Sequence, residues 1–448
     1  MKRRNIIFIF LYLLLFSTLF AFKTISLKDC VKIAIEKNPR IKAARYQLEA
    51  AKKQKKEAFS FYLPHLNFSE TYTNGNNPVY VFSTLLQQQK FGVQNFDINE
   101  LNQPDPVNNF KSSITLYQSI WQGGKVRAAN KMAELNKQIK EKELEGTYQH
   151  LLFLVASDYF MIQLAEENLK TAQLALKSAE SNLKKMRNMF EQGMIVKSDL
   201  LRMNVYVADV KRQLLDAENK ERLSKEKLNV DLSMAIGSDF EIADKLKKME
   251  VKLPSGGFFE EAALKNRPEI LSMKRAIRIA ENKLKQAKGD NYPSLGFFST
   301  LEYNKGTNGG NGGNYILGVA MTYKLFDGFY RGSKIAEERA NLEKYRSQYE
   351  ELKNNILLQV KDAYLKMRTA HQQYEVAFEA VKQAEESLRI VKNRYEVGLA
   401  TVTDLLNAET SLTAARTNLS MATYNYNISY LNLELAAGIL NENSPIFK

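Results

Sequence analysis

The side chains that usually perform enzyme chemistry are few and dispersed in this chain of 448 residues. Its three histidines are His65, His150 and His371, and none belongs to a metal-binding or nucleophile motif. The glycine-rich stretch 306–313 joins two strand-like segments and precedes no helix, so it predicts an exposed hairpin tip instead of a phosphate-binding loop. The sequence therefore favours a protein that is not an enzyme, and it suggests no cofactor.

Two aspartates are placed where their charge would matter. Asp199 follows Gly193, and Asp404 follows Gly398 at the same spacing, 205 residues further along the chain. Each glycine ends a long helical pattern, and each aspartate opens the next one. A carboxylate in the first turn of a helix is favoured by the helix dipole, so helix capping is the simplest role. Several copies of such a carboxylate around one axis would instead form an acidic ring that attracts cations.

The segments around these turns occur twice, which predicts two similar halves in one chain. The repeated pairs are 38–39 with 267–268, 62–64 with 291–293, and 190–201 with 395–406. The first half, 22–243, is expected to hold a helix, two strands around a polar loop, a long helix and a return helix. Their predicted ranges are Leu27–Tyr62, 64–74, 108–122 (with the polar loop at 74–109), Lys125–Gln192 and Ser198–Ala235.

The second half, 244–438, is expected to repeat this order, and 439–448 forms a C-terminal tail. Its predicted helices and strands cover Phe258–Asp290, 293–304, 314–327, Gly332–Tyr395 and Thr401–Ala437. Apolar residues in the return helix follow a 3-4 rhythm from Leu405 to Leu433, which is typical of coiled-coil packing. An ordinary antiparallel bundle would show the same pattern.

The N-terminus predicts export from the cytoplasm. Three basic residues at 2–4 precede an apolar run from Ile6 to Phe20, and the small Ala21 follows, so 1–21 is interpreted as a signal peptide. An uncleaved membrane anchor is the alternative. The formal net charge of +14 comes from lysines that alternate with glutamates on helical faces, which favours solvated surfaces and no nucleic-acid partner. Cys30, the single cysteine, is expected to be a buried helix residue.

The strand segments alternate between apolar and polar residues. Tyr315, Leu317, Val319 and Met321 would share one face, and the residues between them are mostly small or polar. Strands of this length with a period of two match membrane barrel strands, although a half-buried sheet gives the same alternation. Four strands cannot close a barrel, and open edges are not tolerated in lipid. Two copies would give a filled eight-stranded barrel, and three copies would give twelve strands with room for a lumen.

Several motifs in order, two of them repeated, resemble the outer-membrane efflux proteins, or TolC-like channels. They are the segments 26–39, 118–124 with its weaker copy 325–328, 393–398 with 403–406, and 424–426. The resemblance implies a mainly α fold with a β-barrel part. It further implies a homotrimer with a twelve-stranded barrel among outer-membrane lipids, a long coiled-coil helical barrel in the periplasm, and two structural repeats per chain. Such channels are passive and dock to a periplasmic adaptor and an inner-membrane pump.

The resemblance also assigns roles to residues at the two turns. It implies a periplasmic gate and selectivity ring at Asp199, Ser198, Tyr395, Asp404 and Asn407, and adaptor-docking tips at Gly193 and Gly398. This sequence departs from the family at Ala400, where the closing network has an arginine, and at Asn407, where a second ring carboxylate is usual. Lys197 is a candidate replacement for the missing positive charge. Tyr395 is equally compatible with a plain core position.

Two functions of different classes remain open at this point. The first is the outer-membrane exit duct of a tripartite efflux or type I secretion system. The second is an exported coiled-coil structural or adhesive surface protein without a pore, which would need no lipid-facing alternation in its strands.

Overall fold

The computed structural model describes residues 24–447 and divides the chain into two compact units. The predicted signal peptide, 1–21, lies outside the described residues. One unit contains 24–46, 142–271 and 351–447, and the other contains 47–141 and 272–350. Among residues 24–447, no helix is both long enough and apolar enough to cross a membrane.

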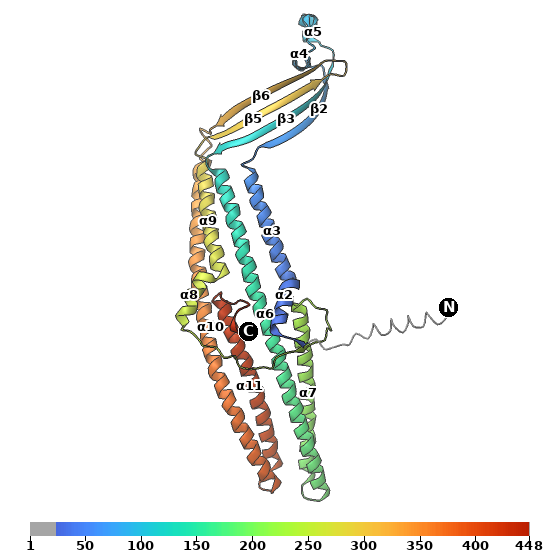
Figure 1. Ribbon diagram of the computed structural model, residues 1–448, viewed down its shortest axis with the longest axis vertical. Coiled ribbons are helices and arrows are strands. Elements are labelled where there is room, and N and C mark those ends of the chain that lie inside the picture. Colours follow the sequence, from blue (N-terminus) through green and yellow to red (C-terminus); the bar gives the residue numbers. More distant parts are fainter. Residues whose placement is uncertain (1–23, 448) are drawn as a thin grey trace, which may run out of the picture. The chain divides into compact units, whose positions relative to one another are not determined.

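The helical unit contains the greater part of two long hairpins, α6–α7 and α10–α11, whose first helices begin in the other unit (Figure 1). Helix α6 spans Lys125–Glu191 and α7 spans Lys197–Asp231; α10 spans Tyr330–Glu396 and α11 spans Val402–Ala436. The predicted long and return helices are confirmed to within a few residues. Buried residues of α11 include Leu405, Ala408, Leu412 and Leu433, which belong to the predicted 3-4 rhythm.

The two predicted single helices at the start of each half are wrong, because a proline divides each of them. The first segment folds as α2 (Leu27–Lys37) and α3 (Pro39–Ser60), and the second as α8 (Gly256–Asn266) and α9 (Pro268–Gly289). Asn38, with ψ 127°, has the extended conformation that a following proline imposes. Its side chain accepts a hydrogen bond from the Arg40 amide at 2.8 Å and donates one to the Asp231 carbonyl at 2.9 Å.

The core of the helical unit gathers around α2, α6, α7 and the C-terminal segment. Cys30 is fully buried there, as predicted, together with Tyr159, Leu228 and Leu431. Two short parallel strands that the sequence analysis missed, β1 (Thr24–Ile25) and β4 (Glu241–Ile242), border this core. The last turn, η2 (Pro445–Phe447), adds the buried ring of Phe447.

The other unit carries an antiparallel sheet of four strands in the order β2-β3-β5-β6. Their ranges are His65–Gly75, Val107–Gln122, Ser294–Lys305 and Asn311–Thr322. The four predicted strands are confirmed, but the last ends at Thr322 instead of 327, and the glycine tip shortens to 306–310. The register places apolar Phe68, Ile114, Leu301 and Tyr315 in line across one face of the sheet.

The opposite face of the sheet is mostly polar, and its polar side chains bond to one another. Ser69 and Ser113 hydroxyls lie 2.8 Å apart, and the Lys111 ammonium lies 2.6 Å from the Glu302 carboxylate. The predicted polar loop 74–109 is not a plain loop. It contains α4 (Pro78–Gln87), a 3-10 turn η1 (Val93–Phe96) and α5 (Ile98–Asn102), which lie at the hairpin end of the sheet (Figure 1).

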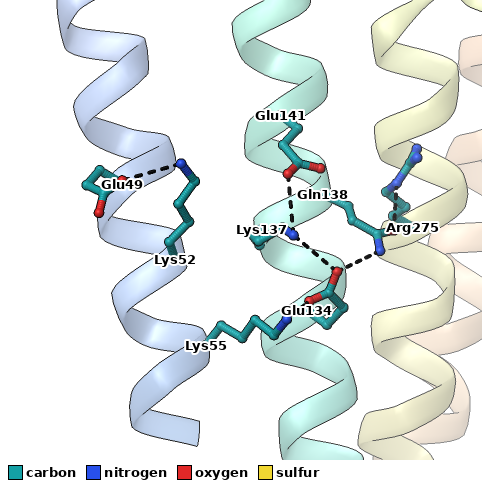
Figure 2. A network of polar contacts seen from close by, with 8 residues as sticks. All are labelled: Glu49, Lys52, Lys55, Glu134, Lys137, Gln138, Glu141 and Arg275. Carbon is teal, nitrogen blue, oxygen red and sulfur yellow. Dashed lines mark hydrogen bonds and ion pairs between the residues drawn. The ribbon is translucent and has the colours of Figure 1, made fainter. Parts of the chain in front are cut away.

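Ion pairs connect the helices of this unit (Figure 2). Lys55 of α3 lies 2.7 Å from Glu134 of α6, and Arg275 of α9 donates to Gln138 of α6 at 3.3 Å. The hydrogen bond from Lys55 is the main cause that lowers the pKa of Glu134 to about 2. The network therefore joins three helices through one ion pair and one hydrogen bond to an amide side chain.

Candidate functional site

The predicted site residues lie at the turns of the two long hairpins. Gly193 (φ 72°) and Gly398 (φ 76°) both have the left-handed conformation that favours glycine. The Gly193 amide donates to the Phe190 carbonyl at 2.9 Å, and the Gly398 amide donates to the Tyr395 carbonyl at 3.0 Å. These bonds satisfy carbonyls at the end of each long helix, so both glycines act as C-terminal caps.

The structure brings the two turns together around one small apolar cluster. Its buried members come from α6, α7 and α11, and Tyr395 of α10 packs against them. They are Ala179, Met186, Met203, Val207, Val402 and Leu406. The candidate gate residues therefore surround a shared core and are not scattered over two independent hairpins.

Polar contacts also join the two hairpins near their turns. Arg202 of α7 donates to the Thr403 hydroxyl of α11 at 2.9 Å. Lys185 of α6 lies 3.3 Å from Glu396 of α10. Further from the turns, Ser178 of α6 donates to the buried Glu409 carboxylate of α11 at 2.7 Å.

Asp404 caps its own helix. Thr401 is the N-cap residue of α11, and its hydroxyl accepts a hydrogen bond from the Asp404 amide at 3.1 Å. In return, the Asp404 carboxylate accepts from the Thr401 amide at 2.9 Å and from the Thr401 hydroxyl at 2.7 Å. These two hydrogen bonds, with the charge of Arg394, hold the pKa of Asp404 below its usual range. The capping interpretation is confirmed for this residue.

Asp199 occupies the equivalent position of α7 without that arrangement. The N-cap residue there is Val196, which has no side-chain oxygen and makes no side-chain capping bond. The Asp199 amide donates to the Val196 carbonyl at 3.1 Å. Within the described part of the chain, no hydrogen bond or ion pair occupies the Asp199 carboxylate, so its charge is available to other groups.

Tyr395 combines the two roles considered for it. Its ring packs against the apolar cluster, and its hydroxyl is buried with no hydrogen-bond partner among residues 24–447. Burial raises the pKa of Tyr395, and the charge of nearby Asp199 raises it further. A buried hydroxyl without a partner costs about 1–3 kcal/mol, so this group is ready to donate to a carboxylate that approaches it.

The other predicted positions are exposed. Lys197 and Ser198 are exposed in the first turn of α7, and Asn407 is exposed in the second turn of α11. Within the described residues Lys197 forms no ion pair, and its proposed substitution for the arginine absent at Ala400 stays a prediction. Sequence reasoning missed Arg202 and Lys185 as bridging residues. The 205-residue repeat places Arg202 opposite Asn407, and this mismatch is the sequence signal that could have identified Arg202.

Metal binding finds no support in the geometry of residues 24–447, where no group of three or more His, Cys, Asp or Glu side chains is placed to hold an ion.

Comparisons with known proteins agree with this geometry. The family model described as "Outer membrane efflux protein" matches residues 30–230 and 261–439. The chain is 23% identical to the alkaline protease secretion protein AprF of Pseudomonas aeruginosa, over 93% of this chain and 85% of AprF. It is 24% identical to the outer membrane protein TolC of Escherichia coli, over 90% of this chain and 80% of TolC.

Solved structures show the same fold. The CmeC outer membrane channel of Campylobacter jejuni superposes with a TM-score of 0.79 at 18% identity, covering 93% of this chain and 87% of CmeC. The outer membrane protein VceC of Vibrio cholerae superposes with a TM-score of 0.77 at 19% identity, covering 92% of this chain and 96% of VceC. Since the family model spans most of the sequence, the chain belongs to the outer membrane efflux protein family.

Proposed function

We propose that this protein is the passive outer-membrane exit duct of a tripartite efflux or type I secretion system. Membership of the efflux family supports transport across the outer membrane. AprF, by its name, serves the secretion of a protease, which supports export of polypeptides. A pore-less structural protein is not favoured, because its sheet would need no exposed face that is mostly apolar.

The observation that carries this proposal is that a single chain leaves the edges of its sheet unpaired and one face of the sheet uncovered. The outer strands β2 and β6 of the sheet each have one unpaired edge. On the apolar face, Phe68 and Tyr315 expose 69% and 68% of their surface. Unpaired edges are not viable in lipid, so three chains closing a twelve-stranded barrel would satisfy both the edges and the apolar face.

The helical unit has matching unsatisfied surfaces. An apolar stripe runs along one side of α7, and a second one runs along one side of α10, because the residues of each stripe are separated by close to whole helical turns. The stripe residues on α7 are Leu201, Val205, Leu215, Leu223 and Val230, and those on α10 are Leu358, Leu365, Val376 and Ile390. We propose that α7 of one copy packs against α10 of the next, so that three chains form a twelve-helix barrel.

The element lengths support two structural repeats in each chain. Helices α6 and α10 each contain 67 residues, and α7 and α11 each contain 35. Under this proposal the halves 22–243 and 244–438 contribute equivalent parts of the barrel, followed by the tail 439–448. Three such chains would give the duct a nearly six-fold appearance.

The gate and selectivity ring are proposed at the turns. Asp199, with its free carboxylate, would carry most of the ring charge, while Asp404 contributes from its capping position. Tyr395 would donate to Asp199 when the entrance closes, and Ser198 and Asn407 would line the same opening. The turns at Gly193 and Gly398 are proposed to contact the periplasmic adaptor, which in turn joins the inner-membrane pump.

Copurification and export assays test this function together. Cells that lack the gene should lose export of at least one substrate, and complementation should restore it. Chemical cross-linking in intact cells should then capture the adaptor on the wild-type protein. A protein that fractionates away from the outer membrane, with no loss of export on deletion, would contradict the proposal.

A further inference from the structure

The insertion between β2 and β3 carries an apolar surface that the duct itself does not explain. Helix α4 begins at Asn77, whose side chain accepts a hydrogen bond from the Tyr80 amide at 3.2 Å. Pro78 occupies the first helical position, where its missing N–H costs nothing. The helix is therefore a stable local structure and not an irregular loop.

Three buried amide side chains, linked by hydrogen bonds, attach the end of α4 to the sheet. The Gln88 side chain donates to the Asn109 side-chain oxygen at 3.0 Å, and Asn109 donates to the Asn304 side-chain oxygen at 2.8 Å. All three residues expose 5% of their surface or less. Asn109 and Asn304 share the face of Lys111 and Glu302, so α4 is attached to the polar face of the sheet.

Gly312 allows the same close approach on β6. A Cβ atom at Gly312 would lie 2.3 Å from the Gln87 carbonyl oxygen, which no side chain tolerates. Gly312 is paired with Asn304 in the register and therefore lies on the polar face as well. The backbone at the end of α4 thus rests directly against this face.

Helix α4 buries mostly polar residues against the sheet and exposes apolar residues on its opposite side. The side that faces the sheet contains buried Val81, Thr84 and Gln88. The opposite side is an apolar stripe of Val79, Phe82 and Leu86, called here the outer stripe, which exposes 78%, 38% and 50% of its members' surfaces. Phe91 contacts the Phe82 ring edge-to-face, with 4.8 Å between the ring centroids, and extends this apolar surface.

We propose that the outer stripes of three copies meet on the barrel axis and form an apolar closure of the outer mouth. This inference rests on the proposed trimeric barrel, in which the polar face lines the lumen. Because α4 is attached to that face, its opposite side must point into the lumen and away from lipid. The occupant of the stripe is therefore a second copy of this chain, related by the three-fold axis.

An apolar constriction hinders the passage of ions, because a narrow pore with apolar walls tends to lose its water. The closure would narrow the outer mouth with apolar side chains and lower its conductance until exported material pushes the three helices apart. It acts in addition to the proposed acidic ring at the hairpin turns. The two barriers differ in chemistry, so they can be weakened separately.

Single-channel recording on the full-length trimer tests the closure. The triple substitution Val79→Ser, Phe82→Ser and Leu86→Ser should raise conductance by roughly two-fold or more, since a polar constriction stays wet. Cells that carry it should also become more sensitive to large hydrophilic antibiotics. The matched control, Val93→Ser with Ile98→Ser, removes apolar side chains that are 87% and 73% exposed but lie outside α4, and it should leave conductance unchanged.

Disulfide cross-linking gives a second measurement that does not depend on the triple variant assembling. Leu86→Cys should link two chains of a trimer under mild oxidation, whereas Val93→Cys should not, and buried Cys30 does not compete. Intact trimers with unchanged conductance in the triple variant, or without any Leu86→Cys cross-link, would overturn the closure alone. A wild-type protein that forms no trimeric channel would instead overturn the proposed function.

Discussion

The N-cap residue of each return helix determines whether the aspartate three residues later is hydrogen-bonded in a capping box. Thr401 binds the Asp404 carboxylate with both its amide and its hydroxyl, whereas Val196 offers no side-chain oxygen to the cap of α7. Two carboxylates at equivalent positions of the repeat therefore have different electrostatic surroundings. The sequence shows both aspartates and their spacing, but it does not show that one is occupied and the other is free.

Exchange of the cap residue should exchange the two roles. Val196→Thr should supply a capping oxygen to α7, stabilise its start by about 1 kcal/mol, and draw Asp199 into a capping box. Cation preference of the channel should fall, as measured by reversal potentials in a salt gradient. Thr401→Val is the matched control and should destabilise α11 by a similar amount while freeing Asp404. Unaltered selectivity in both variants would contradict this account.

Removal of a negative charge and removal of a positive charge at this turn should shift the ion selectivity of the channel in opposite directions. Asp199→Asn should reduce cation preference more than Asp404→Asn does, because the Asp404 charge is already held by hydrogen bonds. Lys197→Gln should increase cation preference, since it removes an exposed positive charge two residues from Asp199. The measurement is again the reversal potential, and an equal effect of both aspartate variants would remove Asp199 from the proposed ring.

The boundaries of helices are predictable from the sequence where a glycine or a proline sets them. The ends of the long helices at Gly193 and Gly398 were predictable, because glycine readily adopts the positive φ that commonly ends a helix. Both glycines have a positive φ in the structure. The divisions before Pro39 and Pro268 were predictable in principle from the restriction that proline places on its neighbour. Helix α4 was hidden, because a ten-residue apolar segment within a polar stretch gives little periodic signal.

A buried carboxyl group between α6 and α7 should make the stability of the helical unit depend on pH. Asp158 is fully buried, and Lys227 lies 2.6 Å from its carboxylate. Burial, with a smaller contribution from Asp231, raises the pKa of Asp158 to about 7, and Lys227 opposes the rise. The folded state thus binds a proton that the unfolded state releases above the ordinary pKa of 3.8.

Stability should therefore fall as pH rises from about 4 to 7, by up to about 1.4 kcal/mol per pH unit, and then level off. Asp158→Asn should flatten this dependence, as followed by thermal dissociation of the trimer across the same pH range. Asp216→Asn, which removes an exposed carboxylate paired with Arg212, is the control and should retain the slope. A persistent slope in Asp158→Asn would assign the pH dependence to other groups.

At the scale of the whole molecule, the chain has apolar surfaces that it cannot cover by itself. The 3-4 rhythm predicted for the second return helix recurs on α7 and marks its buried side, which includes Met203, Val207 and Val210. It missed the second stripe on the opposite side, because charged residues interrupt that stripe and a single chain provides no partner for it. The burial of individual positions distinguishes the two sides, and that information comes only from the fold.

A charge in the α7 stripe should prevent assembly and spare the fold of the chain. Leu223 exposes 70% of its surface in the single chain, so Leu223→Glu should cost little within one copy. In the assembled barrel, the same carboxylate would be buried without a partner, at a cost of several kcal/mol. Heat-resistant trimers should be lost on gel electrophoresis, while the helical circular dichroism signal remains. Leu223→Ala is the matched control and should still assemble; normal trimers of Leu223→Glu would contradict the α7–α10 interface.

The central claim, a trimeric conduit through the outer membrane, is tested most directly by current recording across a planar bilayer. The mature protein extracted from outer membranes should insert as discrete channels of uniform conductance that prefer cations. Each insertion should correspond to a heat-resistant assembly of three chains. Extracted protein that inserts into the bilayer but passes no current above the leak, with or without the substitutions in α4, would contradict the claim.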